Sequence, residues 1–197
     1  MATRQSLREE LERRLGDTAN AVWSDAQLNG FIDNRIKALY PTWFRRDVAI
    51  TLADDGPVQT MPARCRNLYE VGLKRSTSTR VRRMRGWNEG DGQALVPKTG
   101  IEGETLVWSW TKGWDAPVDD TTTLTIPVEA EEAVLLSAHI SALENILTDR
   151  VSVEKYHALQ VRQGITEDDV ATAIDALLAS YREHVDNHRM TLPEVVR

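Results

Sequence analysis

Residues 23–41 read WSDAQLNGFIDNRIKALYP, and this stretch carries the start signals of one amphipathic helix. Ser24 followed by Gln27 is a capping-box pattern, in which each side chain satisfies a backbone N–H of the other residue. Trp23 before the cap and Leu28 after it have the spacing of a hydrophobic staple. A helix is therefore predicted to begin directly after Ser24.

The same stretch also defines the buried face and the end of that helix. Apolar residues recur at helical spacing at Leu28, Phe31, Ile32, Ile36 and Leu39. Pro41 disfavours helical backbone at Tyr40, so the helix is predicted to end or kink there. Trp43 and Phe44 then leave the apolar stripe. We expect them either to cover a junction between helices and a sheet or to contact a neighbouring subunit.

Further helices are predicted on both sides of this one and in the last third of the chain. A shorter helix, closed by Gly16 as a C-cap, follows from the spacing of Leu7, Leu11 and Leu15. Pro127 and the glutamates after it favour the start of a central helix, whose broad apolar face is Val134, Leu135, Ala138, Ala142, Leu143, Ile146 and Leu147. Thr166 and Asp169 begin the last helix, with a stripe of Val170, Ile174, Leu177, Leu178 and Tyr181.

The middle of the chain changes to the periodicity of strands. Residues with high strand propensity alternate with others in VAITL (48–52), LYEVGL (68–73), TSTRVRRM (77–84) and ETLVWSWT (104–111). Turn-forming residues separate them in DDGP (54–57), GWNEGDG (86–92) and PKTGIEG (97–103). An antiparallel sheet of about four strands is the simplest arrangement.

These patterns predict the α+β class, with an α-helical bundle built from the N- and C-terminal segments and an inserted small antiparallel β domain. We expect residues 1–49 and 127–190 to form the bundle and residues 50–126 to form the β domain. Residues 191–197, TLPEVVR, are short, apolar and interrupted by Pro193, so they are predicted to be an extended C-terminal tail.

Composition limits the classes of function. The 197 residues carry a net charge of −6, which argues against a generic nucleic-acid binder. Six tryptophans against two phenylalanines suggest surfaces that become buried on association. Cys65 is the only cysteine, which excludes an intrachain disulfide and a Cys-rich metal site. Neither a signal-peptide core nor an apolar run of about 20 residues is present, so we expect no export and no membrane partner.

The histidines give no strong signal for chemistry. His184 and His188 lie four residues apart near acidic side chains, which is a weak metal-binding pattern because Val185 stands where an HExxH motif needs glutamate. A solvated helix end is the favoured interpretation of this pair. His139 lies beside the central stripe and is expected in the core or an interface, whereas His157 has no obvious partner. We expect no catalytic, cofactor-binding or metal-binding residues, and therefore no enzyme.

Basic residues concentrate between residues 45 and 85. Ten lysines and arginines lie there against four acidic residues, a local excess of six in an acidic chain. The candidates for a basic surface toward a subunit or a lumen are Lys74, Arg75, Arg80, Arg82, Arg83 and Arg85. They are predicted to bind DNA phosphates or an acidic protein partner, or simply to occupy the solvated face of a sheet. The opposite charge of the helical segments favours subunit-to-subunit pairing.

Three stretches together resemble the head-to-tail connector (adaptor) proteins of tailed bacteriophages. WSDAQLNGFIDNRIKALYP is similar to the opening helix of that family, which has an aromatic-Ser/Thr-Asp start and ends in LYP. LTIPVEAEEAVLLSAHISALENILTDR is similar to the helix that follows the β insertion. ITEDDVATAIDALLASYREHVDNHR is similar to the closing helix with its Tyr-Arg-Glu. The likeness covers nearly the full length, while the basic strands match the family only in kind.

The resemblance implies a structural protein of the virion rather than an enzyme. It implies a homo-oligomeric ring, commonly of twelve copies, that is made in the host cytoplasm and docks under the portal protein at the head–tail interface. A downstream tail or stopper protein would bind below, and double-stranded DNA would pass through the lumen. The implied portal-binding residues are Met190, Thr191, Leu192, Pro193, Glu194, Val195, Val196 and Arg197. Ring formation needs a heterologous interface, for which the acidic helices and basic sheet offer complementary faces.

Two alternatives remain open from the sequence. A small DNA-binding regulatory protein would use the basic strands, with Trp87, Trp108 or Trp110 stacking on bases. Its DNA affinity would fall steeply with salt. A metal-dependent hydrolase would use His184 and His188.

Overall fold

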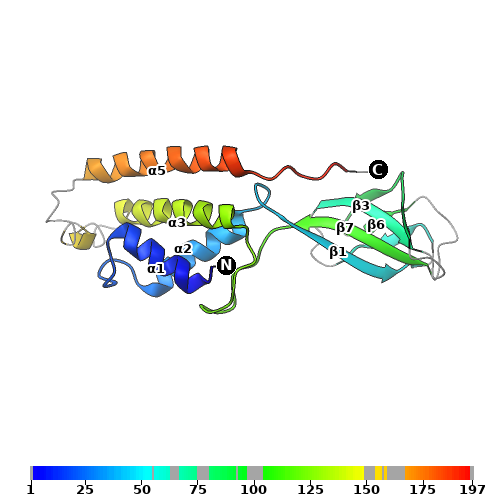
Figure 1. The fold of residues 1–197 in the computed structure, drawn as a ribbon, viewed down its shortest axis with the longest axis horizontal. Coiled ribbons are helices and arrows are strands. Elements are labelled where there is room, and N and C mark those ends of the chain that lie inside the picture. Colours follow the sequence, from blue (N-terminus) through cyan, green and yellow to red (C-terminus); the bar gives the residue numbers. More distant parts are fainter. Residues whose placement is uncertain are drawn as a thin grey trace. The chain divides into compact units, whose positions relative to one another are not determined.

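The computed structural model describes residues 2–54, 56–62, 67–74, 80–91, 93–96, 104–148, 154–156, 158 and 167–195. The chain divides into a helical unit, Met1–Trp43 with Trp114–Met190, and a β unit, Phe44–Gly113 with Thr191–Arg197. Figure 1 shows the helices gathered in the first unit and the strands in the second. The predicted α+β class, with antiparallel sheets inserted between helical segments, is confirmed.

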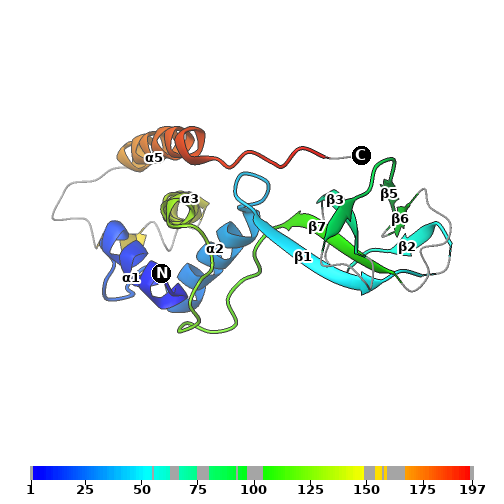
Figure 2. The same cartoon turned by 45° about the vertical axis from the view of Figure 1, so that its right-hand side comes forward.

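The helical unit is organised around α3. Its helices are α1 (Arg4–Leu15), α2 (Asp25–Ala38), α3 (Val128–Thr148) and α5 (Glu167–His188). Figure 2 looks nearly along α3 and shows α5 on one side of it and α1 and α2 on the other. The apolar stripes of all four helices meet in one core, in which Leu28, Ile32 and Ala138 are fully buried. The central position predicted for the Pro127 helix is therefore confirmed.

Local signals at the helix ends act as predicted. The N–H of Ser24 donates to Oε1 of Gln27 at 2.9 Å, and the N–H of Gln27 donates to Oγ of Ser24 at 3.4 Å, so the capping box is formed. Trp23 and Leu28, the two residues of the staple, are fully buried. Gly16 ends α1 with a φ of 71°, in the left-handed region that glycine adopts without steric cost.

A buried carboxylate shapes the connection between α1 and α2. Asp17 is fully buried and accepts hydrogen bonds from the backbone N–H groups of Ala21, Val22 and Trp23 at 2.7, 2.9 and 3.0 Å. Buried backbone donors need such partners, because an unsatisfied N–H away from water costs free energy. Asp17 therefore holds the turn that delivers Trp23 to the core.

The unit boundaries differ from the predicted ones after the β domain. Residues 114–126 belong to the helical unit, although the sequence pattern placed residues 50–126 in the β domain. The reason is long-range packing: Leu124 and Ile126 are buried in the helical core, and the N–H of Leu124 donates to the carbonyl oxygen of Ala2 at 2.8 Å. This segment thus fastens the start of the chain to the bundle.

Asp120 adds an ionic attachment to the same segment. Nη1 of Arg8 and Nε of Arg4 donate to its carboxylate at 2.8 and 2.7 Å, and Nδ2 of Asn29 donates at 3.2 Å. The hydrogen bonds from Arg8 and Arg4 lower the pKa of Asp120 below its usual value. The carboxylate therefore stays ionised and ties the segment to both α1 and α2.

The β unit contains two antiparallel sheets. Its strands are β1 (Arg45–Leu52), β2 (Val58–Thr60), β3 (Asn67–Lys74), β4 (Val81–Arg83), β5 (Asn88–Gly90), β6 (Gln93–Leu95) and β7 (Thr105–Lys112). The larger sheet has the order β1-β7-β3-β4, which confirms the predicted four strands. The smaller sheet, β2-β6-β5, was not predicted. The segment 86–92, expected as a turn, contributes β5, and β1 starts at Arg45 rather than at the predicted domain boundary after residue 49.

The tryptophans lie inside the protein rather than on association surfaces. Exposed fractions are between 0 and 4% for Trp23, Trp43, Trp87, Trp108 and Trp110. The expectation that the excess of tryptophan marks association surfaces is therefore wrong for these five. Trp43 packs in the helical core and Phe44 is also buried, so neither is free to contact a neighbouring subunit as we had considered. Trp114 packs partly buried against the helical core.

Candidate interaction surfaces

The two histidines of α5 interact with the helices around them. Their rings stack with 4.4 Å between centroids. Nε2 of His184 lies 2.6 Å from the carbonyl oxygen of Glu129 in α3, and Nδ1 of His188 lies 3.0 Å from the carbonyl oxygen of His184. The described residues contain no group of three or more His, Cys, Asp or Glu side chains placed to hold a metal ion. The pair thus links the end of α5 to the start of α3, while His157 lies outside the described residues.

His139 of α3 is half-buried near a strong ion pair. The guanidinium of Arg14 donates to both carboxylate oxygens of Glu132 at 2.8 Å and to Glu10 at 2.8 Å. Burial and then the positive charge of Arg14 lower the pKa of His139 from 6.5 to about 4. The imidazole is therefore neutral in the folded protein at neutral pH.

We expect His139 to make the fold sensitive to acid. The unfolded chain binds a proton at this imidazole below pH 6.5, whereas the folded chain binds it only near pH 4. His139 therefore costs no stability above pH 6.5. As the pH falls from 6.5 to 4, its protonation in the unfolded chain lowers the free energy of unfolding by about 2 kcal/mol, once residual solvent screening is allowed for. Urea unfolding of His139→Gln should show a correspondingly flatter pH dependence. The control Val118→Ala, at a position that is 93% exposed, should keep the wild-type slope; equal slopes for wild type and His139→Gln would contradict this.

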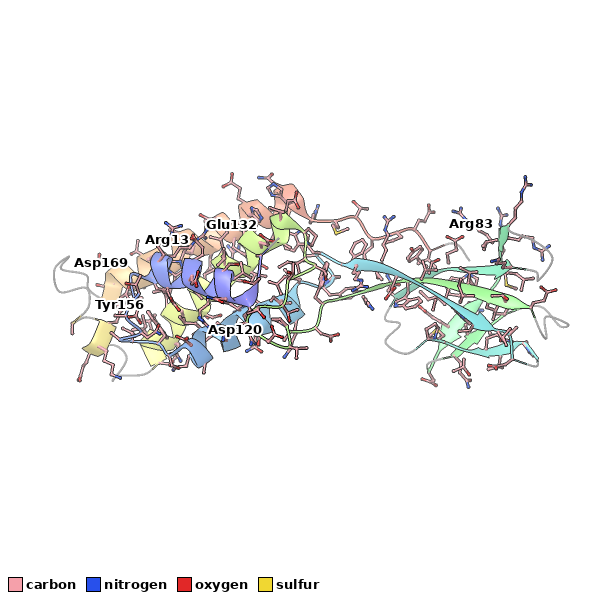
Figure 3. All side chains as sticks on the ribbon, turned by 60° about the horizontal axis from the view of Figure 1, so that its bottom comes forward. Arg13, Arg83, Asp120, Glu132, Tyr156 and Asp169 are labelled. Carbon is pink, nitrogen blue, oxygen red and sulfur yellow. The ribbon has the colours of Figure 1, made fainter. Side chains whose placement is uncertain are left out.

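The predicted basic residues do not form one face. Arg82 and Arg83 are adjacent in β4, so their side chains point to opposite faces of the sheet. Arg83, labelled in Figure 3, donates from Nε to Oε1 of Glu70 at 2.7 Å, which neutralises part of its charge. Lys74 is half-buried at the end of β3 and shares the face of Arg83. Arg80 and Arg85 are exposed outside β4, and Arg75 lies outside the described residues.

From Thr191 to Val195 the C-terminal segment has neither helix nor strand, and Figure 1 draws it as an extended trace. It begins at Met190, whose N–H donates to the carbonyl oxygen of Thr42 at 3.0 Å. Met190, Leu192 and Val195 are exposed by 36 to 41%, while Pro193 is half-buried. Val196 and Arg197 lie outside the described residues. The segment thus presents apolar side chains that a partner could cover.

One surface was not anticipated from the sequence. Val48, Ile50 and Leu52 of β1, which we call the β1 row, are 57, 64 and 73% exposed. The intervening Ala49 and Thr51 point to the core, where Ala49 stands opposite Trp108 in the β1–β7 register and Thr51 accepts a hydrogen bond from Nε1 of Trp108 at 2.7 Å. A contiguous exposed apolar row is a typical feature of interaction sites.

The protein is thus an α+β protein of two units. Its candidate interaction sites are the basic residues of the β unit, the C-terminal segment and the β1 row. No protein-family model and no curated protein matches the chain. Within the part of the chain that the structure describes, the helices are too short or too polar to cross a membrane.

Proposed function

We propose that the chain is a structural head-to-tail connector of a tailed bacteriophage, which forms a ring, docks on the portal protein and links it to the tail. One observation carries the proposal. The three stretches that resemble the connector family become α2, α3 and α5, and α3 packs against both of the others. α2 and α3, which lie more than 80 residues apart in the sequence, thus share one core. This packing supports the resemblance, which rests on three separate stretches of sequence.

The distribution of charge supports a ring interface. The sequence of α5 holds six acidic residues against Arg182, and its acidic side chains Asp168, Asp175, Glu183 and Asp186 are exposed. The β unit exposes arginines, including Arg45, Arg46 and Arg82. A heterologous interface joins two different faces of one subunit type, and opposite charges favour such pairing. In the proposed ring, commonly of twelve copies, DNA passes through the lumen and a tail or stopper protein binds below.

Portal binding is assigned in this proposal to the C-terminal segment. Its exposed Leu192 and Val195 fit a mode in which an extended chain places apolar side chains in a groove of the partner. Because the backbone from Thr191 to Val195 is already extended, binding there would require little change of backbone conformation.

Removal of the residues after Arg189 is expected to weaken portal binding at least tenfold, since the apolar contacts are lost. Leu192→Asp combined with Val195→Asp should act in the same direction, whereas the control Glu194→Gln should bind as the wild type does. Mass photometry and negative-stain electron microscopy with the portal protein encoded in the same viral genome provide the measurement. A protein that remains monomeric and does not bind that portal would contradict the proposed function.

The DNA-binding alternative loses its proposed stacking residues. Trp87 and Trp108 are fully buried and Trp110 is 4% exposed, so bases cannot stack on them without unfolding the β unit. Stacking on exposed aromatic side chains is the usual basis of sequence-tolerant binding to single strands.

A further inference from the structure

β1 forms one edge of the four-stranded sheet. Among the described residues its only strand neighbour is β7, which pairs with it without interruption from Arg45 to Leu52. Figure 2 shows β1 in cyan along that edge. An edge strand carries backbone N–H and C=O groups that can pair with another chain, and proteins usually block them with proline, bulges or very short strands. β1 has eight residues and contains neither proline nor a bulge; charged side chains, which also protect edge strands, occur only at its start, at Arg45, Arg46 and Asp47.

The backbone of the β1 row faces the free edge. The N–H of Ala53 donates to the carbonyl oxygen of Glu104 at 2.8 Å, on the side of β7. In an antiparallel pair these bonding directions alternate along the strand. The N–H and C=O groups of Val48, Ile50 and Leu52 therefore point away from β7. The N–H of Val48 accordingly donates to its neighbour's side chain, Oδ1 of Asp47, at 3.1 Å.

The same three residues thus offer two kinds of contact. Their side chains are 57, 64 and 73% exposed on one face of the sheet, and their backbone groups lie at its free edge. There the N–H of Val48 would exchange its hydrogen bond to Asp47 for one to a partner strand. A partner strand added at this edge would hydrogen-bond with the backbone and pack its own side chains beside the β1 row.

We propose that β1 pairs antiparallel with β1 of a second copy about a two-fold axis at Ile50. In this register Ile50 lies opposite its own equivalent and Val48 lies opposite Leu52. Arg46 then stands opposite Asp54 of the other copy, and both residues are exposed. β1 thus supplies two apolar pair types, and Asp54, which follows the strand and whose carboxylate accepts from the N–H of Thr60 at 3.3 Å, adds two ion pairs. The stretch is therefore self-complementary around its centre.

Neighbouring registers fit less well. A shift that pairs Val48 with Ile50 places Leu52 opposite Arg46. The opposite shift pairs Ile50 with Leu52 and places Val48 opposite Asp54. Each of these leaves an apolar side chain against a charged one, which gives up the favourable cross-strand pairs. The register centred on Ile50 is therefore the one that the sequence of the strand favours.

This inference does not rest on the proposed connector function. A two-fold contact closes on itself, whereas a ring needs a heterologous interface. The β1 contact would therefore join two copies whether or not the chain also enters a ring.

Cysteine cross-linking tests both the contact and its register, in a Cys65→Ser background. Ile50→Cys places two thiols on a pair whose Cα atoms lie about 5.5 Å apart, within the range of about 4.4–6.8 Å that a disulfide needs. Val48→Cys is the matched control, because its own equivalent lies four residues along the partner strand, more than about 13 Å away. We expect Ile50→Cys to form a covalent dimer at least about tenfold faster than Val48→Cys, measured by non-reducing electrophoresis.

Equal cross-linking of both variants would overturn the register, and a wild-type protein that sediments as a monomer up to about 1 mM would overturn the contact. Ile50→Glu provides a second test, since two carboxylates would then face each other and the dimer dissociation constant should rise about a hundredfold. Val118→Glu, at a position that is 93% exposed, should leave the constant unchanged. Portal binding is measured separately, so failure of either proposal can be recognised independently.

Discussion

Replacing Trp108 with alanine is expected to destabilise the β unit by about 4 kcal/mol, which is typical for the removal of a large aromatic side chain from a core. Trp108 is fully buried in the core of the β unit, and its Nε1 donates to Oγ1 of Thr51 at 2.7 Å. Both the packing and the hydrogen bond are lost in the variant. Hydrogen exchange of backbone amides in β3 and β7, followed by mass spectrometry, localises the effect to this unit.

Two control variants separate the loss of packing from the loss of the hydrogen bond and from nonspecific effects. Trp108→Phe keeps much of the buried area but removes the hydrogen bond, so its loss should be about half as large. Val118→Ala, at an exposed position, should leave exchange unchanged. If Trp108→Ala lowered the free energy of unfolding by less than about 1 kcal/mol, the proposal that Trp108 is central to the packing of the β unit would be wrong.

Asp17→Ala is expected to lower the free energy of unfolding of the helical unit by about 3 kcal/mol. The carboxylate accepts three backbone hydrogen bonds, and those from Val22 and Trp23 are buried. Without it, these donors would have no partner in a site from which water is excluded, and each such loss costs about 1–3 kcal/mol. Urea unfolding followed by circular dichroism reports on this unit, since the helices dominate the signal.

The matched control for this variant is Asp175→Ala. Asp175 is exposed on α5, so its removal should change stability by no more than about 0.5 kcal/mol. Comparable losses for the two variants would mean that net charge, rather than the hydrogen bonds of Asp17, determines the effect.

Features encoded locally could be predicted from the sequence. The capping pair Ser24 and Gln27 and the C-cap Gly16 need only residues within one turn of the helix end, so spacing alone predicted them. The apolar stripes of α2 and α3 were also predicted, because helical periodicity persists over several turns. The helical core, and with it the arrangement that supports the connector proposal, follows from these elements.

Features that depend on distant residues were missed. The strands β2, β5 and β6 have three residues each, too few for alternation to be detected. Residues 114–126 have no periodicity, and only their contacts with the start of the chain assign them to the helical unit.

The β1 row was missed for a related reason. Ile50 would ordinarily be predicted to face the core and Ala49 the solvent. The volume of Trp108 opposite Ala49 reverses that preference, because a small residue is needed beside the indole ring. Only the strand pairing reveals which set of side chains is left outside.

The pairing of Arg45 with Lys112 has a consequence for the order of folding during synthesis. It brings together the two ends of a roughly 70-residue insertion, Phe44–Gly113. Once the β unit has formed, the helical segments on either side are joined by a short link instead of a long flexible loop, which lowers the entropic cost of closure by about 2 kcal/mol. Because residues 44–113 leave the ribosome before α3, the two sheets can form before the helical bundle assembles.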